Sequence, residues 1–184
     1  ALSATLGLQS FGDYVNVYDI NFLYMKTVLG YGQAEVGNVA TAIGITQIAG
    51  GETMRKFIRS FGQKAATLYS NLLWIVAFGI FGTSRSAASL ALSLAVMTFG
   101  HQRSTAVRTY LQKHAQATGM GAAEVQGAQA NLLAVLKVAV PIMYGNLFAW
   151  ATSRGRSMPG LPYFVIGALT LCSQMTFSSV DPDK

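Results

Sequence analysis

Charged residues placed inside otherwise apolar stretches are the features of this sequence that could do chemistry. Lys137 lies in the apolar run 132–150, four residues before Pro141, and Asp13 and Asp19 lie in the apolar run 1–25. A charge at the centre of a bilayer costs about 3 kcal/mol or more, and such groups usually face a cavity that carries a solute, an ion or a proton. Binding and movement of a solute are therefore the first chemistry to consider.

These residues cluster on shared faces when each segment is drawn as a helix with about 100° per residue. Asp13, Asn16 and Asp19 share one face, Gln126, Lys137 and Tyr144 share another, and His101 lies on a third segment near mid-bilayer. We predict that these seven side chains line a substrate or ion pathway. Arg103 points away from the His101 face, and the sequence assigns it no partner.

Each of these residues also has a simpler interpretation. Lys137 could extend its stem to an interface or pair with a structural carboxylate. Asp13 and Asp19 could be loop residues if the first helix has a different frame, and His101 could be a hydrogen-bonded packing residue. The spacing alone does not choose between these alternatives.

Composition sets the environment in which these residues act. Of 184 residues, 52% are hydrophobic and only 11% are charged, against roughly 25% charged in an ordinary soluble domain. The net charge of +6 is divided among short loops rather than gathered on one face, which argues against nucleic acid. The pattern contains no metal-ligand cluster, phosphate loop or catalytic triad, so we predict neither an enzyme nor a cofactor or metal site.

Six apolar segments divide the chain, and each is near the roughly 20 residues that a helix needs to cross a bilayer. They are 1–25, 34–54, 62–82, 87–108, 123–150 and 160–178. We therefore predict an all-α, multi-pass integral membrane protein, with 1–184 forming a single bundle of six transmembrane helices. Because the chain begins inside an apolar run, we also expect it to be a fragment of a longer protein.

Basic loops and small residues add an orientation and a packing motif. The largest group of short-loop Lys and Arg residues falls in 55–64, which predicts that this loop and the one before 123–150 are cytoplasmic. Gly37, Gly44 and Gly51 recur every seven residues, a stripe that lets a neighbouring helix approach closely.

Three stretches resemble the C-terminal six-helix half of major facilitator superfamily transporters, most closely the tetracycline-efflux-like drug:proton antiporters. They are LGYGQAEVGNVATAIGITQIAGG, IRSFGQK and EVQGAQANLLAVLKVAVPIMYGNLF. In the third, Gln126, Gly127, Pro141 and Gly145 fall on the spacing of the family's eleventh helix. In the second, Gly62 matches the family's loop signature. Lys137 is not part of the family pattern.

The resemblance implies one half of a twelve-helix bundle, with the N-terminal six-helix half missing from this chain. It implies secondary transport of a small or drug-like molecule by alternating access, with the lipid bilayer as surroundings and protons as a candidate coupling ion. A transport-inactive receptor or scaffold with a transporter-like fold is the alternative. A soluble helical bundle is a third interpretation, which the composition disfavours.

Overall fold

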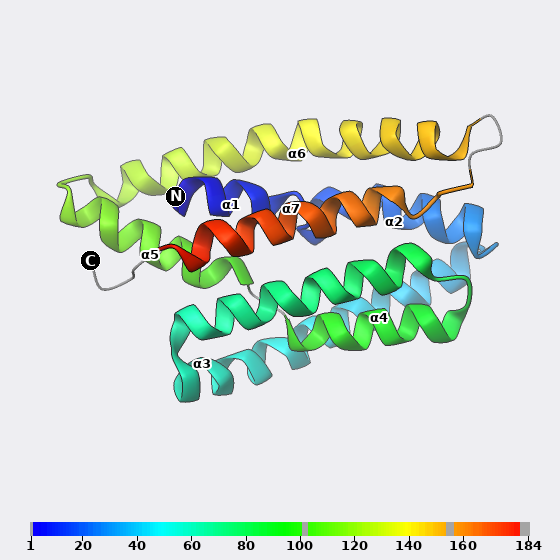
Figure 1. The fold of residues 1–184 in the computed structure, drawn as a ribbon, viewed down its shortest axis with the longest axis horizontal. Coiled ribbons are helices and arrows are strands. Elements are labelled where there is room, and N and C mark those ends of the chain that lie inside the picture. The colour runs from blue at the N-terminus through cyan, green and yellow to red at the C-terminus, as the bar shows by residue number, and fades with distance from the viewer. Residues whose placement is uncertain (1, 101–102, 154–156, 181–184) are drawn as a thin grey trace.

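The computed structural model describes residues 2–100, 103–153 and 157–180, without the side chains of 14–16 and 18, and within these ranges it is all-helical. The helices run along the long axis of an elongated bundle (Figure 1). They are α1 (Leu2–Ser10), α2 (Tyr14–Val28), α3 (Gln33–Thr83), α4 (Ala87–Phe99), α5 (Arg103–Ala117), α6 (Ala122–Thr152) and α7 (Leu161–Ser178). The predicted all-α class is confirmed.

Two of the six predicted segments are each interrupted. Segment 1–25 is divided into α1 and α2 by a break at 11–13, and segment 87–108 is divided into α4 and α5 just after Phe99. The prediction of continuous helices is wrong at these two places. Each break contains a glycine, Gly12 or Gly100, which costs a helix interior up to about 1 kcal/mol relative to alanine. Tertiary partners then replace the lost helical hydrogen bonds, as described below.

Helix α3 reverses direction at Gly62, which has φ 81° and ψ 166°. The two arms, 33–61 and 63–83, run back along each other (Figure 1), and the rings of Phe57 and Tyr69 stack across the turn with centroids 4.9 Å apart. A positive φ is accessible mainly to glycine, so the reversal is confined to this residue. The predicted polar loop at 55–64 is therefore helical on both sides of a one-residue turn.

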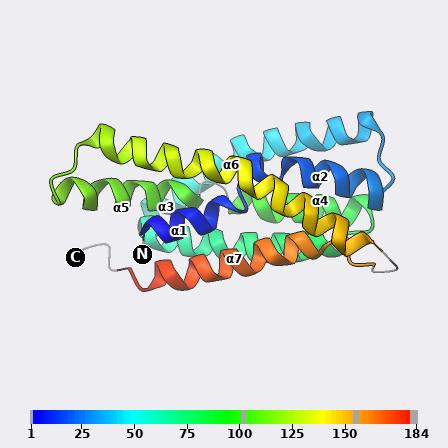
Figure 2. The ribbon, with the colours of Figure 1, turned by 90° about the horizontal axis from the view of Figure 1, so that it is seen from above.

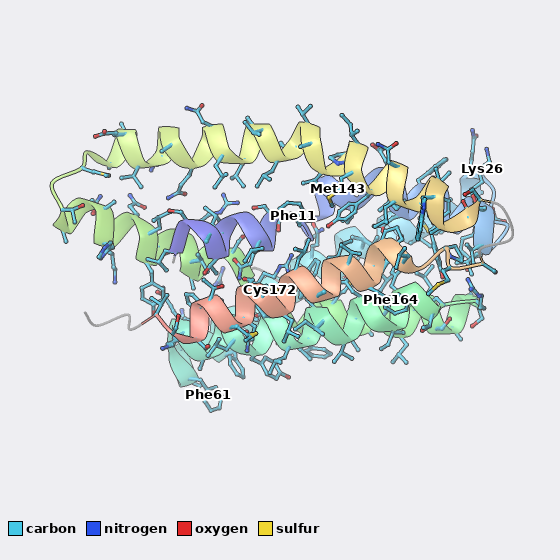
Figure 3. All side chains as sticks on the ribbon, turned by 45° about the horizontal axis from the view of Figure 1, so that its top comes forward. Phe11, Lys26, Phe61, Met143, Phe164 and Cys172 are labelled. Carbon is cyan, nitrogen blue, oxygen red and sulfur yellow. The ribbon has the colours of Figure 1, made fainter. Side chains whose placement is uncertain are left out.

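The connections alternate between the two ends of the bundle. The Gly62 turn, the α5–α6 connection, the beginning of α1 and the end of α7 lie at one end of the bundle. The α2–α3 and α3–α4 connections, the end of α6 and the beginning of α7 lie at the opposite end (Figures 1 and 2). Figure 3 marks the two ends with Phe61 and Lys26. This alternation is the one that the six predicted segments require.

The core consists of two apolar clusters separated by a polar layer. The larger cluster includes Tyr24, Phe78, Phe81, Tyr144, Tyr163 and Ile166, and the smaller one is built on Leu6, Val107 and Phe177. Buried polar residues occupy the positions between them on α1, the second arm of α3, α5 and α7. They are Gln9, Ser70, Asn71, Arg103, Thr170 and Ser173.

The outer surface is strongly apolar. Large apolar side chains are exposed on α2, α3, α4, α6 and α7, and Ile48, Val135 and Val138 are 80%, 67% and 66% exposed. Extensive apolar exposure of this kind is typical of an interaction or membrane surface. Three helices, α3, α6 and α7, are long and apolar enough to cross a membrane. Helix α6 has 31 residues, which at 1.5 Å per residue gives roughly 46 Å, enough to cross with a tilt.

Four of the predicted structural glycines have no close helix neighbour. Gly37, Gly44, Gly127 and Gly145 are exposed, and a Cβ added to any of them would meet nothing within 4 Å. Gly51 is half-buried. Pro141 lies inside α6, where the helix continues through it.

Candidate functional site

The two helix interruptions face each other in the middle of the bundle. A Cβ on Gly12 would lie 2.6 Å from Nη2 of Arg103, and a Cβ on Gly100 would lie 2.5 Å from Cδ1 of Trp74. Only glycine leaves room for these side chains, because real Cβ contacts do not come this close. The breaks are thus the places where buried side chains reach the backbone.

Arg103 occupies the space between the breaks. Its guanidinium donates to the carbonyl oxygen of Gln9 at 2.6 Å and to Oγ1 of Thr170 at 3.2 Å, and it lies 4.4 Å from the ring centroid of Trp74. The side chain is 3% exposed. A buried guanidinium requires such partners, because its desolvation would otherwise be prohibitive.

Asp13 is the charged partner of this arginine. Its Oδ1 lies 3.8 Å from Nη2 of Arg103, and the carboxylate side chain is 30% exposed. The distance is too long for a direct hydrogen bond, so the attraction is mainly Coulombic. The carboxylate therefore remains free to accept hydrogen bonds from a solute or water in the adjoining space.

The carbonyl groups released at the α1–α2 break receive side-chain donors from other helices. Arg103 serves the carbonyl of Gln9, and the hydroxyl of Tyr144 on α6 donates to the carbonyl of Phe11 at 3.0 Å. Trp74 does the same at the second break, where its Nε1 donates to the carbonyl of Gly100 at 2.7 Å. Unpaired backbone groups are costly in an apolar interior, and these three bonds explain how both breaks are tolerated.

A row of side-chain amides continues the polar layer away from Arg103. Nε2 of Gln9 donates to Oδ1 of Asn71 at 3.1 Å, and Nδ2 of Asn71 donates to Oε1 of Gln174 at 3.1 Å. The row links α1, the second arm of α3 and α7. It fixes the register of these helices, because each of the two bonds joins a donor on one helix to an acceptor on another.

A cavity of about 610 Å³ opens beside Asp13 and Arg103. Helices α2, α4 and α5 and both arms of α3 contribute its walls. The lining includes Val17, Asn21, Ile43, Thr46, Gln47, Trp74, Phe81, Leu94, Met97, Thr98, Ser104, Thr105, Arg108, Thr109 and Gln112. This volume suits a small organic molecule. A mostly apolar wall with a few charged groups can hold and orient such a molecule.

The structure distributes the seven predicted pathway residues among different places. Asp13 lines the cavity, and Tyr144 is buried in the core. Asp19, Gln126 and Lys137 are exposed and are not among the cavity residues. His101 and the side chain of Asn16 lie outside the described residues.

Asp13 is not the carboxylate partner of Lys137, because it pairs with Arg103. The reason is geometric. Helical periodicity predicts which residues share a face, but it does not predict which part of that face other helices cover. Lys137 shares its face with the buried Tyr144, yet no residue of α6 between Val125 and Val140 is buried.

The central residue that sequence reasoning missed is Arg103. Its partners Gln9 and Thr170 are 94 and 67 residues away in the chain, so no local spacing indicates them. The available signal was that Arg103 lies in an apolar segment directly after a glycine-containing break. Ser104, Thr105 and Arg108, by contrast, share one helical face in the sequence and line the cavity together.

Comparison with family models, with curated proteins and with solved structures finds no match for this chain. The resemblance to major facilitator superfamily transporters accordingly stays a prediction. The following proposals rest on the geometry and chemistry of the chain.

Proposed function

We propose that this chain is a multi-pass membrane bundle that forms one half of a secondary carrier, and that it moves a small solute by alternating access. The observation that carries the proposal is the cavity at the meeting point of two interrupted helices, lined by the Asp13–Arg103 pair. Carriers commonly place their sites where broken helices meet near the middle of the membrane. The apolar exterior and the three helices of spanning length support a membrane setting.

The proposed topology has the Gly62 turn and the α5–α6 connection on the cytoplasmic side. Cysteine accessibility tests it in a Cys172→Ser background, since Cys172 is exposed. Ser60 and Ser157 are exposed at opposite ends of the bundle, whereas Ser84 is buried and unsuitable. In intact cells, an impermeant maleimide should label Ser157→Cys and not Ser60→Cys. Equal labelling of both positions contradicts a multi-pass arrangement, and the reverse pattern contradicts the proposed orientation.

Counterflow in proteoliposomes tests transport. Vesicles are preloaded with unlabelled benzoate, glucose or tetraethylammonium, and uptake of the same labelled solute is followed. A transient overshoot for one of them is the expected result. Thr98→Trp should abolish it by filling the cavity. Thr41→Trp is the matched control, because Thr41 is exposed and makes the same hydroxyl bond to the carbonyl four residues earlier.

The alternative is a transport-inactive receptor or scaffold. It is favoured by the observation that Arg103, Tyr144 and Trp74 all bond to backbone carbonyls of this chain. In that case the polar groups serve helix packing alone. A flat counterflow record for all three solutes, together with correct topology, supports this alternative over a carrier.

A further inference from the structure

We propose that the cavity binds a small organic anion with an apolar body, and that Arg108 holds its negative charge. This inference rests on the proposed function and names the class of solute. Arg103, Arg108 and Asp13 are the charged residues that line the cavity among those the structure describes. Two guanidinium groups against one carboxylate leave one positive charge unbalanced.

Arg103 is not the group that meets the solute. Its guanidinium is nearly fully buried and is occupied by the Gln9 carbonyl and the Thr170 hydroxyl. Its Nη2 also lies 3.8 Å from Oδ1 of Asp13. Displacing these partners would leave the buried guanidinium without its acceptors, and an unpaired buried charge is strongly unfavourable. This pair therefore acts as a fixed element of the wall.

Arg108, unlike Arg103, has a buried guanidinium nitrogen without a hydrogen-bond partner in the described part of the chain. It is half-buried one turn further along α5, and it lines the cavity together with Ser104, Thr105 and Gln112. The unpaired nitrogen is Nε, and the ion pairs found among the described residues do not include Arg108. A buried donor without a partner is costly. A solute carboxylate supplies two acceptor oxygens in the geometry that a guanidinium fork matches.

The rest of the cavity wall is largely apolar, and it favours an anion that carries an apolar group. Trp74, Phe81, Leu94 and Met97 line the cavity with Val17, and such side chains bury an aliphatic or aromatic group favourably. An organic cation is disfavoured, because the carboxylate of Asp13 already faces Arg103 and also lies within the electrostatic reach of Arg108. Polar anions without an apolar part would leave this wall uncovered.

Quenching of Trp74 fluorescence measures the charge preference of the cavity directly. In a Trp150→Phe background and a neutral detergent, Trp74 is the remaining tryptophan of the chain. Relative to free tryptophan amide, iodide should quench it at least threefold more efficiently than caesium. Arg108→Gln should bring the two ions to within a factor of about 1.5. Arg108→Lys should keep the iodide preference, and Lys113→Gln, an exposed charge outside the cavity, should not change it.

A charge-matched ligand series then tests the solute class by isothermal titration calorimetry. We expect 2-naphthoate to bind at least tenfold more tightly than 2-naphthamide, and 2-naphthylmethylammonium to bind more weakly than both. Arg108→Gln should reduce the advantage of the carboxylate to about twofold. The inference is overturned if caesium quenches Trp74 as well as iodide does, if Arg108→Gln leaves the iodide preference intact, or if the amide or the ammonium binds as tightly as 2-naphthoate. Binding of 2-naphthoate without counterflow would contradict the proposed transport function but not the anion site. Counterflow of tetraethylammonium would contradict the anion site but not the transport function.

Discussion

Replacing Arg103 with methionine, and comparing the result with Asp13→Asn, tests which contacts of the guanidinium stabilise the fold. These contacts are its hydrogen bonds and its place over Trp74 on one side, and its attraction to Asp13 on the other. The guanidinium makes two hydrogen bonds to neutral groups and lies over the ring of Trp74. Hydrogen bonds to charged groups contribute about 1.5–3 kcal/mol each, and a buried cation over an aromatic ring contributes up to about 2 kcal/mol. The attraction to Asp13 is weaker, because that carboxylate is 30% exposed and 3.8 Å away.

We therefore expect Arg103→Met to destabilise the chain by about 3–5 kcal/mol, the lower part of the sum of two hydrogen bonds to a charged group and one buried cation–ring contact. In a chain of this size that corresponds to a fall in melting temperature of roughly 6–20 °C. Asp13→Asn should cost no more than about 1 kcal/mol, since solvent and the remaining partners of Arg103 compensate. The double variant should lie close to Arg103→Met alone.

Thermal unfolding of the purified chain in detergent, followed by circular dichroism, gives these values. Arg55→Met is the control, because Arg55 is exposed and pairs with Glu52 at the surface, where such pairs contribute about 0–1 kcal/mol. If Asp13→Asn destabilises as much as Arg103→Met, the carboxylate rather than the backbone and ring contacts holds Arg103. That result would refute this account of the site.

Three further substitutions probe the breaks and the exposed face of α6. Gly12→Ala should destabilise the chain by about 1–3 kcal/mol, because the added Cβ would lie 2.6 Å from a guanidinium nitrogen. Gly127→Ala is the control in the same melting assay. It should be neutral or slightly stabilising, because a Cβ there meets nothing within 4 Å. Tyr144→Phe should cost about 1–3 kcal/mol by leaving a carbonyl at the α1–α2 break without its donor; an unchanged melting temperature would show that water replaces the hydroxyl. Lys137→Met should leave the melting temperature within about 2 °C, because Lys137 is exposed; a large loss of stability would show that it has a buried partner.

The positions of the helices followed from the sequence because apolar segment length is a local property. The six predicted segments overlap α1 plus α2, the two arms of α3, α4 plus α5, α6 and α7. The predicted ends at 54 and 108 are wrong, because the first arm of α3 continues to residue 61 and α5 continues to Ala117. The shared face of Ser104, Thr105 and Arg108 was also local information, since it depends only on the helical repeat. Asp13, by contrast, lies in the break between α1 and α2 rather than on a continuous helix, as in the loop alternative for this residue.

The tertiary structure decided where the helices break and which faces turn inward. The breaks at Gly12 and Gly100 are stabilised by Arg103, Tyr144 and Trp74, and each of these bonds joins residues at least 26 positions apart. Lys137 is exposed although it shares a helical face with the buried Tyr144, because the neighbouring helices bury no residue of α6 between Val125 and Val140. Residue type and spacing determine what each helix can offer to a site, and only the long-range packing of the helices decides which of those groups meet.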